Sequence, residues 1–120
     1  MRLFDDLPPT EREISEGVAD WHRAALMRVP KTPLQHAQQA HSYRALRGHL
    51  SACFAEAEAI QLALQLPHWW EFRGQRFESF DGAWKALQDS GDLWATKVQL
   101  HYRLPDGTEE HFSTSSSGVA

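Results

Sequence analysis

The chain has a single cysteine, Cys53, among its 120 residues. An intrachain disulfide needs two cysteines and a cysteine-rich zinc site needs several, so both are excluded. Cysteine on an apolar helix face usually acts as a small hydrophobic side chain, whereas a reactive thiolate needs exposure and a cationic neighbour. We therefore expect Cys53 to be buried and chemically inert.

Long apolar runs and catalytic motifs are also missing. No run approaches the roughly 18 apolar residues of a membrane span, and acids and prolines stand where a signal peptide needs an apolar core. The chain has no glycine-rich phosphate loop, no Gly-x-Ser-x-Gly elbow and no His-Glu-x-x-His pair. These absences favour a cytoplasmic, non-enzymatic protein without a cofactor, a catalytic residue or a metal.

Acidic residues are missing locally. Between Asp20 and Glu56 there is none, although the net charge of the chain is −4. The same segment, 21–55, carries five cationic residues: Arg23, Arg28, Lys31, Arg44 and Arg47. A helix dipole accounts for cations near the end of a first helix, but not for the last two, which lie near the start of a second. This basic segment is either a solvated face or a binding surface for phosphate or an acidic protein.

Two helices are predicted before Pro67. Thr10 can cap the first, and Pro30 ends it. The second begins at Pro33 and meets no breaker before Pro67, with Gly48 as its one weak interior point. The pattern therefore predicts one helix of roughly 30 residues, about 45 Å long.

Two apolar seams follow this predicted long helix on opposite sides. The large-residue seam comprises Tyr43, Leu46, Leu50, Cys53, Ala57, Ile60 and Leu64. The small-residue seam comprises Ala45, Gly48, Ala52, Ala55, Ala59, Leu62 and Leu66. A helix that is apolar on two sides must be covered twice. The first helix can cover one side, and either the C-terminal part of the chain or a second copy must cover the other, so a homodimer is expected.

Beyond Pro67 the pattern changes to short strands and turns. Strands are predicted at 69–72 and 75–77, a helix from Ser79 to Gly91, and a long strand at 94–104. One face of that strand is apolar and is expected to be buried: Trp94, Thr96, Val98, Leu100, Tyr102 and Leu104. Alternation of this kind indicates a half-buried antiparallel strand.

A hairpin loop is predicted at Pro105-Asp106-Gly107, with glycine in the left-handed position. The predicted pairs are Leu104 with Thr108, Arg103 with Glu109, His101 with His111, and Leu100 with Phe112. A two-residue turn would move Phe112 to the polar face, so the core selects the longer loop.

These elements predict an α+β fold in the order α-α-β-β-α-β-β. It is expected to be one domain, with a helical hairpin at 10–66 and a β/α subdomain at 67–113. An arm at 1–9 and a flexible tail at 114–120 complete the chain.

Two pairs of side chains are candidates for contacts with a partner or a ligand. Trp69 and Trp70 are adjacent in a strand and point to opposite faces, so either both faces are covered or one indole is an interface anchor. His101 and His111 face each other on the polar side, as two solvated histidines or as a metal or pH-sensitive pair. The helical histidines lack the i, i+4 spacing of metal ligands.

The function that we expect is non-enzymatic binding to a larger protein or ribonucleoprotein with an acidic or phosphate surface. One concrete form is an inhibitor from a phage or mobile element that blocks a host defence complex, in the manner of an anti-CRISPR protein. The expected contact residues are Arg23, Arg28, Arg44, Arg47, Trp69 and Trp70. The alternatives are a nucleic-acid-binding accessory protein that uses the segment 21–55, and a small enzyme without a recognisable motif.

Overall fold

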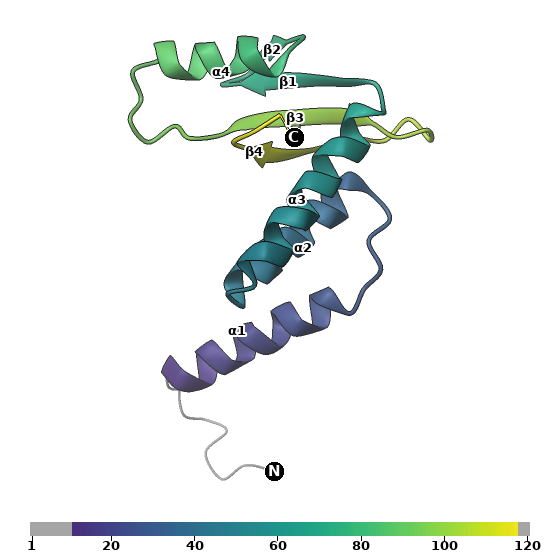
Figure 1. Ribbon diagram of the computed structural model, residues 1–120, viewed down its shortest axis with the longest axis vertical. Coiled ribbons are helices and arrows are strands. Elements are labelled where there is room, and N and C mark those ends of the chain that lie inside the picture. Colours follow the sequence, from purple (N-terminus) through teal and green to yellow (C-terminus); the bar gives the residue numbers. More distant parts are fainter. Residues whose placement is uncertain (1–10, 118–120) are drawn as a thin grey trace.

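The computed structural model describes residues 11–117 of the chain, with side chains from residue 16 onward. The expected arm at 1–9 and the last three residues of the expected tail lie outside the described residues. Within 11–117 the chain forms four helices and one four-stranded antiparallel sheet, so the predicted α+β class is confirmed (Figure 1). The elements are α1 (Glu11–Leu26), α2 (Pro33–Ala45), α3 (His49–Leu64), β1 (His68–Phe72), β2 (Gln75–Phe77), α4 (Phe80–Asp89), β3 (Val98–Arg103) and β4 (Glu109–Thr114).

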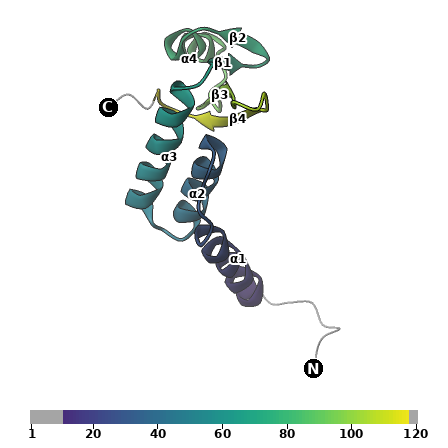
Figure 2. The same cartoon turned by 90° about the vertical axis from the view of Figure 1, so that its right-hand side faces the viewer.

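The predicted long helix is wrong, because the chain reverses between α2 and α3. Arg47 adopts a left-handed backbone conformation with φ of 62°, which no α-helix can continue through. The amide of Gly48 donates to the carbonyl of Tyr43 at 2.7 Å and closes the turn. Helices α2 and α3 then lie side by side as an antiparallel pair (Figures 1 and 2). The helical hairpin is therefore α2–α3 rather than the first helix against a long second one.

This reversal also changes which helical residues are buried. Ala52 and Ala59, from the small-residue seam, are fully buried, because small side chains let α2 and α3 approach closely. From the large-residue seam, Ile60 is buried, but Leu50 is 71% exposed and Cys53 is exposed. The prediction of a buried Cys53 is therefore wrong. Because α3 folds back on α2, the helix pattern no longer requires a second copy of the chain.

The sheet has the strand order β2-β1-β3-β4. The predicted register of the last hairpin is confirmed, with Leu100 opposite Phe112, His101 opposite His111 and Arg103 opposite Glu109. In the loop, Gly107 has φ of 90°, as a left-handed position requires. The strand β4 continues through Thr114, which is fully buried, so the expected tail begins later than residue 114.

The long strand begins at Val98 instead of residue 94. The Asp92 carboxylate accepts the amide of Trp94 at 2.9 Å and holds this segment in a turn. Trp94 is 91% exposed and Thr96 is exposed as well, so the predicted place of these two residues on the buried face is wrong. Val98, Leu100 and Tyr102 are buried as expected.

One face of the sheet carries the core, and helices α3 and α4 pack against it. Trp70, Leu100 and Phe112 form a row across this face, and Ile60 from α3 and Leu87 from α4 belong to the same cluster. The opposite face is not covered by a helix of the described residues (Figure 2).

The Tyr102 hydroxyl joins the helical hairpin to the sheet. It accepts the amide of Leu34 in the first turn of α2 at 2.7 Å and donates to the Glu110 carboxylate on β4 at 2.6 Å. Burial, together with the Glu110 carboxylate, raises the pKa of Tyr102, so the hydroxyl keeps its proton.

Helix α1 extends away from the rest of the fold and contacts α2 (Figure 2). A buried hydrogen bond fastens it there, since Nδ1 of His22 lies 3.0 Å from Oγ of Ser42. Among residues 11–117, no helix combines the length and the apolar character that a membrane crossing needs.

The backbone at Arg47 leads to a test of the reversal. A non-glycine residue in a left-handed conformation destabilises the folded state by roughly 1–2 kcal/mol. Glycine removes this strain, but it also raises the entropy of the unfolded chain, which offsets part of the gain in stability. We expect Arg47→Gly to stabilise the protein by up to about 1 kcal/mol in urea unfolding. As the matched control, Gln38→Gly in the interior of α2 should destabilise it by about 1 kcal/mol. A less stable Arg47→Gly protein would contradict the reversal at this residue.

Candidate functional site

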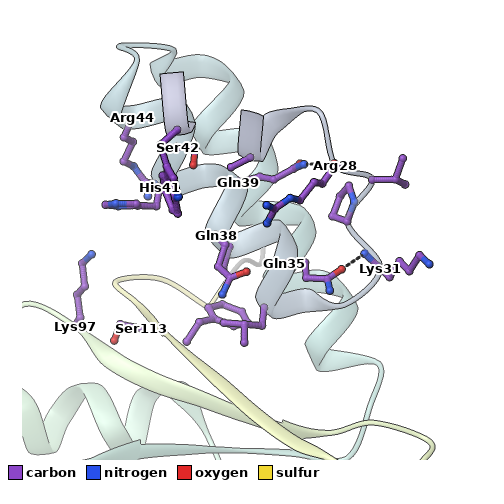
Figure 3. Close-up of a pocket in the computed structure, with 17 residues that line it drawn as sticks. Arg28, Lys31, Gln35, Gln38, Gln39, His41, Ser42, Arg44, Lys97 and Ser113 are labelled. Atoms are coloured by element: carbon purple, nitrogen blue, oxygen red, sulfur yellow. Dashed lines mark hydrogen bonds between the residues drawn. The ribbon is translucent and has the colours of Figure 1, made fainter. Parts of the chain in front are cut away.

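A groove of about 720 Å³ lies between the α1–α2 region and the end of the sheet at β4 (Figure 3). We call it the basic groove. Its lining residues are Trp21, Ala25, Arg28, Val29, Pro30, Lys31, Leu34, Gln35, Ala37, Gln38, Gln39, His41, Ser42, Arg44, Lys97, Phe112 and Ser113. They come from α1, the connection to α2, α2 itself, the segment before β3, and β4.

The charge of the basic groove has one sign. Four of its lining residues are cationic (Arg28, Lys31, Arg44 and Lys97), and none of the lining residues is acidic. Within the described part of the chain, only one of the four has an ion-pair partner, since Arg44 contacts the Glu56 carboxylate of α3. In Figure 3, Lys97 extends from the sheet toward α2, whereas Lys31 points away from the groove. The groove is therefore a place where anionic groups are favoured.

Neutral hydrogen-bonding groups line the same surface. The Gln39 amide donates to the carbonyl of Arg28 at 2.6 Å, and the Gln35 side chain accepts the amide of Lys31 at 2.5 Å. These two bonds hold the connection between α1 and α2 against α2. Gln38 and His41 are exposed in the groove and are available to a ligand.

The predicted basic segment is divided by the fold. Arg28 and Arg44 line the basic groove. Arg23 instead pairs with Asp20 one turn earlier on α1, at 2.7 Å. Arg47 lies at the α2–α3 reversal and is not part of the groove lining.

The two adjacent tryptophans are both buried. Trp70 is 2% exposed in the core and Trp69 is 8% exposed on the opposite face. The exposed indoles are Trp21, at the edge of the basic groove, and Trp94, in the loop before β3, whereas Trp84 is half-buried. Burial on both faces of β1 leaves neither Trp69 nor Trp70 accessible as an anchor in this structure.

Lys97 is the one cationic residue of the groove lining that the sequence pattern did not single out. It lies far along the chain from the segment 21–55, and its only sequence signal is its place among the polar residues of the predicted strand. The fold brings Lys97 close to α2, and the amino-acid sequence alone gives no sign that these two segments lie near each other.

A stack of side chains covers Trp69 on the open face of the sheet. The Arg76 guanidinium lies 4.4 Å from the ring centroid of Trp69, and the His101 ring stacks on the other side at 5.5 Å. His111 continues the stack at 4.7 Å from His101. The stack therefore runs across all four strands, and it explains why a tryptophan is buried on a face without a helix.

The charge of His101 is set by competing neighbours. Its Nε2 lies 2.8 Å from the Glu71 carboxylate, which favours the protonated ring. Burial acts in the other direction and is the largest effect, and the neighbouring His111 adds to it. The net result is a His101 pKa below the ordinary value of 6.5.

Two other arrangements resemble chemical sites without forming them. His22 and Ser42 are within hydrogen-bonding distance, as a base and a nucleophile would be, but Ser42 is only 2% exposed. We assign the pair to fastening α1. Within residues 11–117, no group of three or more His, Cys, Asp or Glu side chains is placed to hold a metal ion.

The chain matches no protein-family model, no curated protein and no solved structure.

The lowered pKa of His101 gives a pH dependence with a definite sign. Because the folded pKa lies below the unfolded value of about 6.5, the unfolded chain binds this proton more readily. The contribution of His101 is complete above about pH 6.5 and declines as the pH falls toward the folded pKa. We expect His101→Phe, which keeps a ring in the stack, to lose less stability than the parent between about pH 7 and pH 5.

Urea unfolding at several pH values measures this difference. The matched control is His49→Gln, since His49 is exposed and lies outside the stack. Its pH dependence should stay like that of the parent. Equal pH dependence in His101→Phe and the parent would show that His101 is not the residue responsible.

Proposed function

We propose that this protein is a non-enzymatic binding protein that occupies an acidic surface of a larger partner protein through the basic groove. The observation that supports the proposal is the convergence of Arg28, Arg44 and Lys97 on one groove whose lining contains no carboxylate. Two of these, Arg28 and Lys97, have no ion-pair partner in the part of the chain that the structure describes.

Folding alone gives little reason for this arrangement. Exposed ion pairs contribute only about 0–1 kcal/mol each, and like charges around one groove repel one another. Carboxylates of a partner would relieve that repulsion, and the forked donors of arginine match a carboxylate in two contacts. The charge pattern is thus suited to an acidic partner.

The biological role that we favour is inhibition by surface occupation in the cytoplasm. An inhibitor from a phage or mobile element, acting on a host defence complex as anti-CRISPR proteins do, needs a partner-binding surface and no chemistry of its own. A small chain with one basic groove and without a catalytic motif is compatible with that role. The partner is then a protein or a ribonucleoprotein.

Binding to nucleic acid is a second candidate, favoured by one particular observation. Trp21 lines the basic groove and is 63% exposed, so an indole lies beside cationic side chains. Single-stranded nucleic acids bind to such combinations, in which bases stack on aromatic rings and cations follow the phosphates. Salt separates the two candidates, because the affinity for nucleic acid falls steeply as counterions are released.

Charge reversal in the groove tests the proposed function. Arg28→Glu combined with Lys97→Glu leaves the Arg44–Glu56 ion pair in place and reverses the unpaired charges. We expect affinity for a partner recovered from nuclease-treated bacterial lysate to fall by about 2 kcal/mol or more, because like charges then oppose each other. Calorimetry measures the affinity, and circular dichroism checks the fold.

The matched control is Lys85→Glu, an exposed position on α4 outside the groove lining. It changes the net charge in the same direction and should leave binding unchanged. If the groove variant folds normally and binds the partner as tightly as the parent, the basic groove is only a solvated surface.

A further inference from the structure

The strand β4 forms a free edge of the sheet. The order β2-β1-β3-β4 places it at one end, and no other strand of the described residues pairs with its outer side. The opposite edge, β2, has only 3 residues, whereas β4 has 6. An edge strand of this length can pair with another extended chain.

The hydrogen bonds around the last hairpin show which main-chain groups of β4 face outward. The amide of Leu104 donates to the carbonyl of Thr108 at 2.8 Å, so this pair bonds within the hairpin. The amide of Arg103 donates away from β4, to the carbonyl of Pro67 at 2.9 Å. Inward and outward residues alternate in an antiparallel ladder. Glu109 is the partner of Arg103 in this ladder. The main-chain amide and carbonyl groups of Glu109 and of every second residue after it therefore point away from β3: Glu109, His111 and Ser113.

The basic groove meets this edge at its C-terminal end. Both Phe112 and Ser113 line the groove, although neighbouring strand residues point to opposite faces of a sheet. A groove that is lined by residues from both faces of the strand must run along the edge of that strand. Gln38 and His41 of α2 line the groove as well, so a chain beside Ser113 would lie between β4 and α2 (Figure 3).

Charge distinguishes the two ends of β4. Glu109 lies at the start of the strand and pairs with Arg103, outside the groove. At the other end, Lys97 and Ser113 lie close together and Lys97 has no ion-pair partner among the described residues (Figure 3). An acidic chain is therefore favoured at the Ser113 end and disfavoured at the Glu109 end.

We propose that an extended acidic segment of the partner protein adds to β4 as an outer strand at Ser113 and lies in the basic groove. The inference rests on the proposed function, because the same groove supplies the charge. Main-chain hydrogen bonds to the outward groups supply the register, and Lys97, Arg28 and Arg44 select acidic side chains. An oligonucleotide satisfies the charges but has no peptide groups to pair with the strand.

The variant that tests strand addition is Ser113→Pro. Proline removes an amide that points outward, which an edge strand tolerates, and it leaves every charge unchanged. Ser113→Ala is the matched control, because it keeps that amide. The probe is a peptide of about eight alternating glutamate and threonine residues, sufficient to pair along the groove end of the strand.

Titration with this peptide should show equal affinity for the parent and Ser113→Ala. For Ser113→Pro the affinity should fall about tenfold, the value of one main-chain hydrogen bond. Hydrogen exchange at the amide of Ser113 should slow when the peptide binds the parent. A Ser113→Pro protein that folds and binds like the parent would overturn strand addition while leaving the role of the groove charges standing.

The peptide itself gives a second test that needs no variant to fold. N-methylation of alternate peptide amides, in both possible phases, keeps the charges and removes the donors on one side of the strand. One phase should bind about tenfold more weakly than the unmodified peptide. Unchanged binding in both phases would overturn the proposal.

Two further measurements separate this inference from the proposed function. If the Arg28→Glu, Lys97→Glu double variant binds the peptide like the parent while Ser113→Pro does not, the groove charges do not contribute to binding. The proposed function is then contradicted, whereas strand addition is supported. If an oligothymidylate of similar charge binds more tightly than the peptide, and Ser113→Pro does not weaken it, the groove recognises nucleic acid and strand addition is overturned.

Discussion

The Tyr102 hydroxyl sets the position of the helical hairpin relative to the sheet. It is buried, and its two hydrogen bonds join the start of α2 to the edge strand β4. An unpaired hydroxyl in this place would cost the full desolvation of the group, and the two hydrogen bonds offset that cost. The basic groove depends on this junction, because one of its walls is α2 and the other is the end of β4.

Within residues 11–117, charged side chains have partners on the open face of the sheet but are mostly unpaired in the basic groove. On the open face of the sheet, the Glu71 carboxylate contacts His101 and the Arg76 guanidinium lies over the ring of the buried Trp69, so these charged groups have partners. In the basic groove only Arg44 is satisfied in this way, and Arg28 and Lys97 face the groove without a partner among the described residues. The first arrangement stabilises the fold, whereas in the second the unpaired cations repel one another.

Local patterns predicted the C-terminal half better than the helices. The hairpin from β3 to β4 follows from alternation and one left-handed glycine, both of which act between near neighbours in the chain. The reversal at Arg47 could not be predicted in this way, because helix propensity favours continuation through arginine and only Gly48 weakens it. Packing of α3 along α2 outweighs that preference, as the burial of Ala52 and Ala59 shows.

The sequence by itself determined the α+β class, the register of the β3–β4 hairpin and the absence of acids from 21 to 55. Tertiary structure decided what the basic segment became. It paired Arg44 with Glu56 of α3, placed Arg47 at the helix reversal, and brought Lys97 to the groove, whereas the Arg23–Asp20 pair is local to α1. The physical reason is range, since secondary structure depends on contacts a few residues apart, whereas a groove depends on which distant side chains the core brings together.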